Sequence, residues 1–324
     1  MNILFCSVGR RGELIRDFRK TMGGAGTIVA VDNSNTAPAL YLADKRYLVP
    51  RIDSPDYIDV LIDICHKEKI DVITTLIDPE IELLSTNRDR FEQMGILLLA
   101  PKETTAKLCF DKYKMYQYLS SKGIPTVLTY GSWNDFYSAY KNGEIGLPVF
   151  VKPRTGSGSV GARIVSSLDE LKMAIDLDSE LIIQENVSGD DVDADVYVDT
   201  VSHELVSAFT KRKLGKTIGG ANKTVSFKDE AFFAALRRAV SVLDLIGPAD
   251  MDFFIIDGEY VLSEVNPRFG GAYLHAYAAG IDFVKLIENN VAGIANEPAF
   301  GNYDEGLVMM MFDSVVIKRI DELV

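Results

Sequence analysis

Apolar residues in the first hundred positions follow two different spacings. Short apolar runs at 2–6, 27–31, 72–76 and 96–99 predict buried strands. Between them, apolar residues recur every three or four positions from Tyr57 to Lys69, which predicts a helix, and Ser54-Pro55 is typical of a helix start. A glycine-containing loop at 7–12 and a helix to Met22 follow the first strand. This alternation predicts an open parallel α/β sheet with covering helices over residues 1–103.

The pattern changes after residue 103. A helix capped by Asp111 ends at Gly123, and strand-like runs at 126–129, 149–152, 161–165 and 181–184 surround a helix that opens with a capping box at Ser167. We therefore expect a small α+β lobe over residues 104–187. A second, larger lobe follows over 188–324. Its predicted parts are an antiparallel pair at 192–200 and 205–210, a cationic loop at 211–223, a helix at 229–245 and a β-hairpin at 250–271.

The hairpin carries acidic and amide residues at alternate positions. A plain two-residue turn at Asp257-Gly258 would oppose Asp252 to Ser263 and send Glu264 to the other face. A three-residue loop, Ile256-Asp257-Gly258, instead places Asp252 opposite Leu262 and Asp250 opposite Glu264. We expect this odd-length loop, with all the oxygen ligands on one face.

Carboxylates plus an amide carbonyl make a hard site suited to Mg²⁺. Asp252, Glu264 and Asn266 are the candidate ligands, and Asp250 could take the place of Asp252. A solvated acidic face on an ordinary hairpin is the alternative.

A lysine at a strand end, Lys152, precedes a glycine- and serine-rich loop. Glycines let the backbone approach phosphate oxygens, hydroxyls donate to them, and the lysine supplies charge. A plain hairpin tip is the alternative. Asp78 and Glu80 follow another strand, at the edge where open α/β sheets bind ligands, so both are candidate substrate contacts unless they form a plain loop.

Composition narrows the class of partner. The net charge is −13 and no long basic run occurs, so nucleic acid is not an expected partner. Three scattered cysteines and three histidines without metal spacing argue against disulfides and zinc. Without a signal peptide pattern or a long apolar span, we expect a cytoplasmic protein that does not enter a membrane.

Taken in order, these features resemble the ATP-grasp superfamily. They are Lys112, the lysine and glycine loop at 152–161, Glu185-Asn186-Val187, Gly189-Asp190-Asp191, and Asp252 followed by Glu264-x-Asn266-Pro267-Arg268. The chain looks most like one synthetase half of the carbamoyl-phosphate synthase large subunit, and also resembles biotin carboxylase and D-alanine–D-alanine ligase. The likeness covers roughly residues 104–290, and residues 1–103 look like the preceding α/β domain of those enzymes.

The resemblance implies a role for each matching residue. Glu185, Asn186 and Val187 would bind adenine, and Asp191 or its neighbour Asp193 would bind ribose. Arg268 would stabilise a phosphorylated intermediate, and Arg268 and Lys152 are the expected catalytic residues. Asp252, Glu264 and Asn266 would hold Mg²⁺, with Mn²⁺ as a possible substitute. The implied contacts to ATP phosphates are Lys112, Lys152, Gly156, Ser157, Gly158 and Ser159.

The implied activity is an ATP- and Mg²⁺-dependent, ADP-forming carboxylate–amine ligase that works through an acyl phosphate. Its partners would be small-molecule carboxylate and amine substrates, and a homodimer is possible by the same resemblance. Two alternatives stay open: activation of bicarbonate with ammonia, with or without a glutaminase partner, and a non-catalytic ATP-binding regulatory module.

Residues beside the motifs leave two further choices open. Lys211, Arg212 and Lys213 either line the phosphate side of the pocket or form a solvated basic loop. Tyr273 and His275 either face the substrate or pack in the core, and we favour the core.

Overall fold

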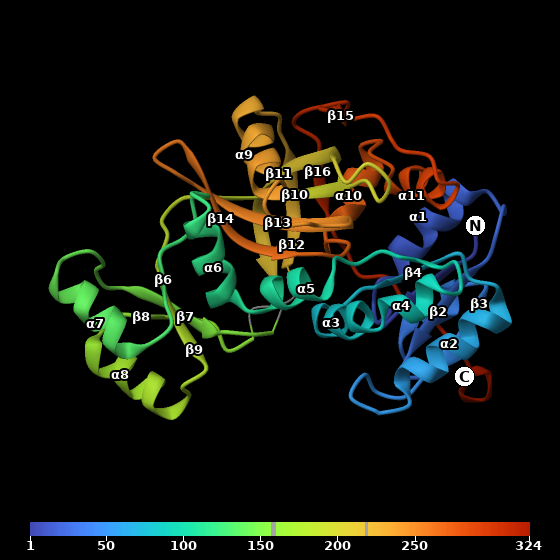
Figure 1. The fold of residues 1–324 in the computed structure, drawn as a ribbon, viewed down its shortest axis with the longest axis horizontal. Helices are drawn as coiled ribbons and strands as arrows, with labels where there is room; N and C mark the ends of the chain where they lie inside the picture. The colour runs from blue at the N-terminus through green and yellow to red at the C-terminus, as the bar shows by residue number, and fades with distance from the viewer. Residues whose placement is uncertain (157–159, 218–219) are drawn as a thin grey trace.

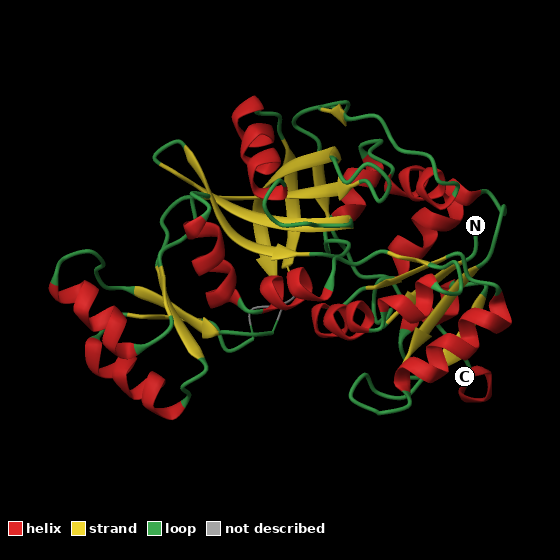
Figure 2. Cartoon of the chain, in the orientation of Figure 1, coloured by secondary structure: helices red, strands yellow, loops and turns green. Residues whose placement is uncertain are grey.

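A computed structural model describes residues 1–156, 160–217 and 220–324. Its strands form three separate sheets that lie along the long axis of the molecule (Figures 1 and 2). The predicted fold class, a parallel α/β domain followed by a two-lobed α+β region, is confirmed. None of the helices in the described ranges is long and apolar enough to cross a membrane.

The first sheet is entirely parallel, with strand order β3-β2-β1-β4-β5. Ile3 and Phe5 of β1 pack on one face with Phe18 of α1, while Leu4 and Cys6 face α2 on the other. Both faces are therefore covered, as the continuous apolar runs predict. The strands are β1 (Ile3–Cys6), β2 (Ile28–Asp32), β3 (Lys45–Leu48), β4 (Val72–Thr75) and β5 (Leu97–Leu98). The helices are α1 (Gly12–Met22), η1 (Pro38–Leu42), α2 (Tyr57–Glu68), α3 (Asp78–Thr86) and α4 (Arg88–Glu92).

A small lobe follows, with its own core. Its antiparallel sheet has the order β6-β9-β7-β8, and two helices cover it. Ser132 and Ser167 cap these helices by accepting from the backbone N–H groups of Asp135 and Glu170. The elements are β6 (Thr129–Tyr130), α7 (Trp133–Lys141), β7 (Val149–Pro153), β8 (Arg163–Val165), α8 (Leu168–Leu177) and β9 (Leu181–Glu185).

Two helices, α5 (Glu103–Phe110) and α6 (Lys112–Ser121), lie between the first domain and the small lobe (Figure 1). Met115 and Leu119 of α6 belong to the core beneath the large sheet, and the Tyr118 hydroxyl donates to the Val242 carbonyl at 2.6 Å. The start of α6 is therefore held at a fixed place beside the large sheet.

The third sheet has the strand order β14-β13-β10-β11-β12-β16, with β15 beside β11. Its strands are β10 (Asp190–Val198), β11 (Leu205–Thr217), β12 (Gly220–Ser226), β13 (Gly247–Ile256), β14 (Glu259–Asn266), β15 (Ala299–Phe300) and β16 (Val308–Met310). Its helices are α9 (Glu230–Val240), α10 (Tyr273–Ala278), α11 (Phe283–Val291) and η2 (Ile320–Glu322).

The predicted loop at 211–223 is wrong, because most of this segment is the hairpin of β11 and β12. Two alternate positions on one face of β11 are lysines instead of apolar residues. Lys211 is buried and Lys213 largely so against acidic side chains of β10 and β13, so this part of the strand lacks the alternation that marks a half-buried strand.

The turn of the acidic hairpin also differs from the prediction. Ile256 pairs with Glu259 across a two-residue turn, in which Asp257 and Gly258 both have positive φ. A β-bulge at Ser263 then shifts the register, so that Asp252 lies opposite Glu264 and Asp250 opposite Asn266. The predicted residue pairs were therefore wrong. The acidic residues do share one face of the hairpin, as predicted, because one extra residue at the bulge shifts the pairing by one position, which is the effect that an odd-length loop would have had.

Candidate functional site

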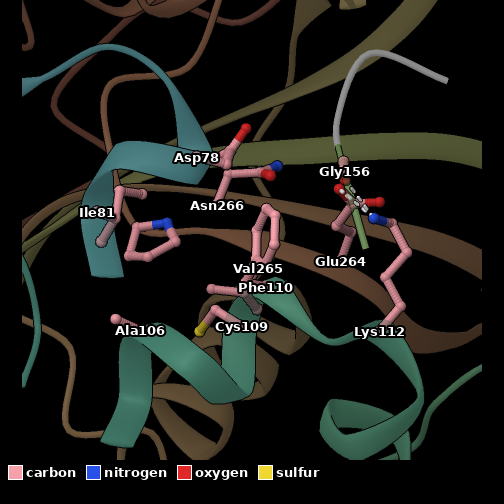
Figure 3. Close-up of a pocket in the computed structure, with 11 residues that line it drawn as sticks. Asp78, Ile81, Ala106, Cys109, Phe110, Lys112, Gly156, Glu264, Val265 and Asn266 are labelled. Carbon is pink, nitrogen blue, oxygen red and sulfur yellow. Dashed lines mark hydrogen bonds and ion pairs between the residues drawn. The ribbon is translucent and has the colours of Figure 1, made fainter. Parts of the chain in front are cut away.

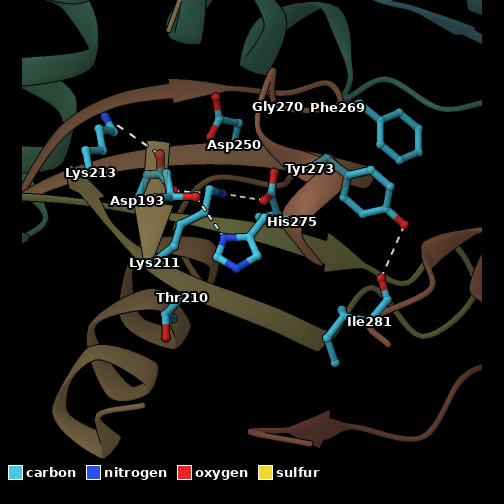
Figure 4. Close-up of polar contacts among 12 residues, drawn as sticks. Asp193, Thr210, Lys211, Lys213, Asp250, Phe269, Gly270, Tyr273, His275 and Ile281 are labelled. Carbon is cyan, nitrogen blue, oxygen red and sulfur yellow. Dashed lines mark hydrogen bonds and ion pairs between the residues drawn. The ribbon is translucent and has the colours of Figure 1, made fainter. Parts of the chain in front are cut away.

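One face of the large sheet carries interleaved lysines and aspartates (Figure 4). The Lys211 ammonium is buried and contacts Asp193 at 2.7 Å and Asp195. Lys213, two residues along β11, contacts Asp252 and lies 3.0 Å from Asp191. β13, β10 and β11 are neighbours in the sheet, so these contacts link side chains of opposite charge across three adjacent strands. The solvated basic loop considered for this segment is therefore wrong for Lys211 and Lys213.

Burial and neighbouring charges set the protonation of this face. Burial raises the pKa of Asp193 and of Asp195 to about 6, against the opposing effect of Lys211. Burial and the nearby Asp252 raise the pKa of Asp250 to about 7. Burial disfavours the Lys211 and Lys213 cations, but the aspartates outweigh it and raise both pKa values. The pKa of Asp252 is lowered instead, because Lys213 outweighs the effect of burial. The face therefore favours charged lysines beside a charged Asp252 and three carboxyl groups that bind protons more readily than usual.

Three of these carboxylates could share a cation. Oxygens of Asp193, Asp250 and Asp252 lie within 4.8 Å of one another. Glu264 is opposite Asp252 on the next strand, and Asn266 is opposite Asp250. A group of closely spaced carboxylate oxygens with an amide nearby suits Mg²⁺, so the residues present fit such an ion.

A pocket lies beside this face, between α3, α5 and β14 (Figure 3). Lys112 enters it from the start of α6, where its ammonium donates to the Gly156 carbonyl and lies 4.0 Å from Glu264. Asp111 caps α6 and also accepts from Arg154 at 2.8 Å, which ties this helix to the end of β7. The pocket is lined by Asp78, Ile81, Ala106, Cys109, Phe110, Lys112, Gly156, Glu264, Val265, Asn266 and Pro267.

Lys152 approaches the same region from β7 of the small lobe. Its side chain is buried, and burial lowers its pKa although Glu264 opposes the shift and Lys112 adds to it. Two lysines from different elements thus lie near Glu264, where an anion would relieve their mutual repulsion. Ser157, Gly158 and Ser159 lie outside the described residues.

The residues expected to bind adenine lie in the connection between the small lobe and β10. Glu185 ends β9, with an exposed side chain and a backbone N–H that donates to the Leu128 carbonyl at 2.9 Å. Asn186 and Val187 are half-buried in the connection. Asp191 and Asp193 both contact Lys213, so the choice between them for ribose stays a prediction.

Arg268 joins the large sheet to the first domain. Its guanidinium pairs with Asp78 through two contacts of 2.9 and 3.0 Å and lies 3.8 Å from Asp250. Asp78 does not lie in a plain loop, since it begins α3 with Pro79 next to it. Glu80 lies in the same helix but has a structural role. Its buried carboxylate accepts from the Tyr57 hydroxyl and, at 2.5 Å, from the Thr75 hydroxyl, so it holds α3 to the end of β4 and to α2.

Arg11 was not among the sequence candidates. It donates to the Phe269 and Gly270 carbonyls at 3.2 and 2.6 Å, and burial together with Arg268 lowers its pKa to about 10. The available signal was its place just after β1, at the carboxyl edge of the parallel sheet.

Tyr273 and His275 pack in the core, as favoured from the sequence. The Tyr273 hydroxyl accepts from the Phe283 N–H at 2.8 Å, and His275 Nδ1 lies 2.8 Å from the Thr224 hydroxyl. Burial and Lys211 lower the pKa of His275 to about 4, so its ring stays neutral.

Two family models match the chain. A "PylC-like, N-terminal domain" matches residues 3–99, and an "ATP-grasp domain" matches residues 109–272, about half of the chain. A D-alanine–D-alanine ligase of Corynebacterium aurimucosum is 26% identical over 69% of this chain and 70% of its own length. A formate-dependent phosphoribosylglycinamide formyltransferase of Ignicoccus hospitalis is 26% identical over 74% of this chain and 63% of its own.

The arginine-specific carbamoyl phosphate synthase large chain of Bacillus subtilis is 24% identical over 92% of this chain, which spans only 30% of that protein. Solved structures agree in fold. The biotin carboxylase domain of Hydrogenobacter thermophilus 2-oxoglutarate carboxylase, solved with MgADP and bicarbonate, has a TM-score of 0.76 at 18% identity, covering 95% of this chain and 73% of that one.

The N5-carboxyaminoimidazole synthetase of Staphylococcus aureus, solved with ADP, has a TM-score of 0.74 at 18% identity, covering 92% of this chain and 78% of that one. Ligases of the ATP-grasp family join a carboxylate to an amine through an acyl phosphate and release ADP, which is the reaction class that the sequence resemblance implies. On the match over residues 109–272, this chain belongs to the ATP-grasp family.

Proposed function

We propose that this protein is an ATP- and Mg²⁺-dependent ligase that forms ADP while joining a small carboxylate to a small amine. One observation carries the proposal: lysines of two separate elements, Lys112 of α6 and Lys152 of β7, converge near the carboxylate of Glu264, whose strand neighbours are Asp252 and Asn266. Converging cations and carboxylates suit a metal-bound polyphosphate, since the cations bind phosphate oxygens and the carboxylates bind the metal.

The nucleotide would lie between the lobes. Lys112, Lys152 and the loop at 156–159 would hold its phosphates, while Glu185, Asn186 and Val187 contact adenine. Asp191 or Asp193 would bind ribose. Asp252, Glu264 and Asn266 would hold Mg²⁺, with Asp250 as an alternative ligand and Mn²⁺ as a possible substitute.

Lys213 has a particular place in this proposal, because its ammonium already contacts Asp252. A bound divalent ion neutralises charge on the transferring phosphoryl oxygens. Lys213 balances part of the carboxylate charge in the structure, and it would be available to contact the phosphates if Asp252 held a cation instead.

Arg268 would act on the transferred group. The guanidinium is held by Asp78 and Asp250, and these carboxylates raise its pKa against the effect of burial, so it stays charged. Fixed positive charge next to the phosphates lowers the barrier for phosphoryl transfer to the carboxylate substrate. The amine then attacks the acyl phosphate and phosphate leaves.

The test is phosphate release from ATP with Mg²⁺, across a panel of amino acids and small carboxylic acids, with mass spectrometry of the product. We expect turnover with at least one acid–amine pair. Asp252→Asn and Glu264→Gln should each lower kcat at least a hundredfold while ATP still binds. Glu259→Gln, at the exposed start of the same strand, is the matched control and should keep full activity.

The same experiment separates the alternatives. Turnover that depends on bicarbonate and ammonia would indicate the carbamoyl-phosphate reaction instead. ATP binding without turnover under every condition would contradict the ligase and favour a regulatory module. We also propose that the protein forms a homodimer.

A further inference from the structure

The small lobe contacts α6 directly beside the two lysines that converge near Glu264. Asp111 precedes Lys112 in the chain, and Arg154 follows Lys152 by two residues. Arg154 Nε donates to Asp111 Oδ1 at 2.8 Å, and the Arg154 carbonyl accepts from the Lys112 N–H at 3.0 Å. One residue of the small lobe therefore binds the start of α6 through both its side chain and its backbone.

Other contacts fix both members of this ion pair. Asp111 Oδ1 also accepts from the Lys114 N–H at 3.0 Å, as the N-cap of α6. The Arg154 N–H donates to the Glu180 carbonyl at 2.9 Å, and its guanidinium lies over the Tyr113 ring, 5.6 Å from the centroid. The side chains are 12% exposed for Asp111 and 32% exposed for Arg154. Exposed ion pairs contribute little because solvent screens them and two free side chains must be ordered, and both losses are smaller here.

The contacts of this pair favour its charged form. Burial disfavours the Asp111 carboxylate, but the bonds from Arg154 and from the Lys114 N–H outweigh burial and lower its pKa. The bond to Asp111 raises the pKa of Arg154 against the effect of burial. Both groups are therefore charged at neutral pH, which makes the bond between them a strong, charge-assisted one.

The two lysines beside the pair repel each other when no anion lies between them. Burial lowers the pKa of Lys152, and Lys112 adds to this shift although Glu264 opposes it. The Lys112 ammonium reaches the Gly156 carbonyl and lies 4.0 Å from Glu264 (Figure 3). Repulsion between these like charges favours separation of the small lobe from α6, whereas the ion pair of Asp111 with Arg154 opposes it.

We propose that Asp111 and Arg154 are positioning residues that keep Lys112 and Lys152 together before ATP binds. Their ion pair acts as a latch between α6 and the small lobe. A site that is already in its binding conformation binds more tightly, because no ligand affinity is lost in reaching that conformation. The contact of the two lysines with phosphate rests on the proposed function, whereas the latch itself does not.

The latch predicts a change in ATP affinity without a change in the chemical step. Arg154→Gln removes the ion pair, and Asp111→Asn removes the charge but keeps a good N-cap residue. Each should raise the Kd and the KM for Mg-ATP at least about tenfold. The value of kcat should change less than about twofold, because bound phosphates then keep the two lysines together. Calorimetry and phosphate release measure these constants.

A double-mutant cycle separates the latch from a direct contact of Arg154 with phosphate. If the two residues act through one bond, Asp111→Asn combined with Arg154→Gln should bind Mg-ATP about as weakly as either single variant. Arg154→Lys, which can still donate to Asp111, should recover most of the lost affinity. Unchanged affinity in Asp111→Asn alone would overturn the latch and assign Arg154 to the phosphates. Lys172→Gln is the matched control, because it breaks an exposed ion pair with Asp176 on α8 of the same lobe and should leave affinity unchanged.

Hydrogen exchange without nucleotide tests the latch independently of the ligase. In Arg154→Gln the Lys112 amide should exchange at least about tenfold faster, because its acceptor is the backbone carbonyl of residue 154 in the released lobe. The Lys114 amide should keep its rate, because Asp111 still accepts from it. Unchanged exchange at Lys112 would contradict the latch. Faster exchange in a protein whose native form does not bind Mg-ATP would contradict only the proposed function.

Discussion

At the scale of single residues, burial favours the neutral form of a carboxyl group wherever no cation or hydrogen-bond donor outweighs it. Asp17 on α1 shows this away from the site, because burial and the nearby Glu13 raise its pKa from 3.8 to about 7, although Lys20 opposes the shift. The folded protein therefore keeps a proton that the unfolded chain has lost between these values. The free energy of unfolding therefore decreases as pH rises through this window. Above pH 7 Asp17 is charged in the folded protein as well, and its full destabilising effect is present.

We predict that Asp17→Asn stabilises the protein at pH 8 by about 1 kcal/mol, a value reduced for solvent screening at this partly exposed position. The gain should vanish below about pH 4, where both states are protonated. Denaturant unfolding at the two pH values measures it. Asp63→Asn, at an exposed position on α2, is the control, and an equal gain at both pH values would contradict the prediction.

At the scale of elements, the turn after β14 positions the site by close contact. Gly270 lies against the carboxylates, since a Cβ there would be 2.6 Å from Asp195 Oδ1 and 2.9 Å from Asp250 Cγ. Its carbonyl also accepts from Arg11. The absence of a side chain at 270 therefore lets the first domain and the large sheet approach each other.

Gly270→Ala should lower ATP turnover at least tenfold, because the added methyl group displaces Asp195 or Asp250. Gly258→Ala is a matched comparison at the other end of β14. It has free space around it but a φ of 84°, so it should cost about 1 kcal/mol of stability and leave turnover intact. Thermal melting and phosphate release measure both. Full activity in Gly270→Ala would show that the contact is not needed.

At the scale of the whole molecule, one hydrophobic core is shared between two of the three sheets. A single core runs from Ile3 and Phe5 of β1 through α1 to the large sheet, and Phe18 meets Phe269 edge to face at 5.6 Å. The small lobe has a separate core around Phe136 and Val149. The first domain and the large sheet should therefore unfold together and the small lobe independently.

Hydrogen exchange under mild denaturant tests this division. Phe136→Ala should destabilise the small lobe by about 3–5 kcal/mol and speed exchange in β6–β9 alone. Phe18→Ala should speed exchange in both β1 and β10. Equal acceleration across all three sheets in Phe136→Ala would mean that the lobe is not an independent unit.

The local pattern of apolar and polar residues was enough to predict much of the fold. Continuous apolar runs indicated strands buried on both faces, and alternating acids indicated a hairpin with one acidic face, since both follow from geometry within a few residues. Lys112 and Lys152 were identified by resemblance of their motifs, and the structure brings both near Glu264.

Only the tertiary structure revealed the strand character of 211–217, the bulge at Ser263, and the contacts of Arg11 and of Arg268 with Asp78. Lys211 looks like a solvent-exposed residue until aspartates from β10 surround it. A buried charge is stable only where partners distant in sequence meet it, and no local pattern encodes that meeting.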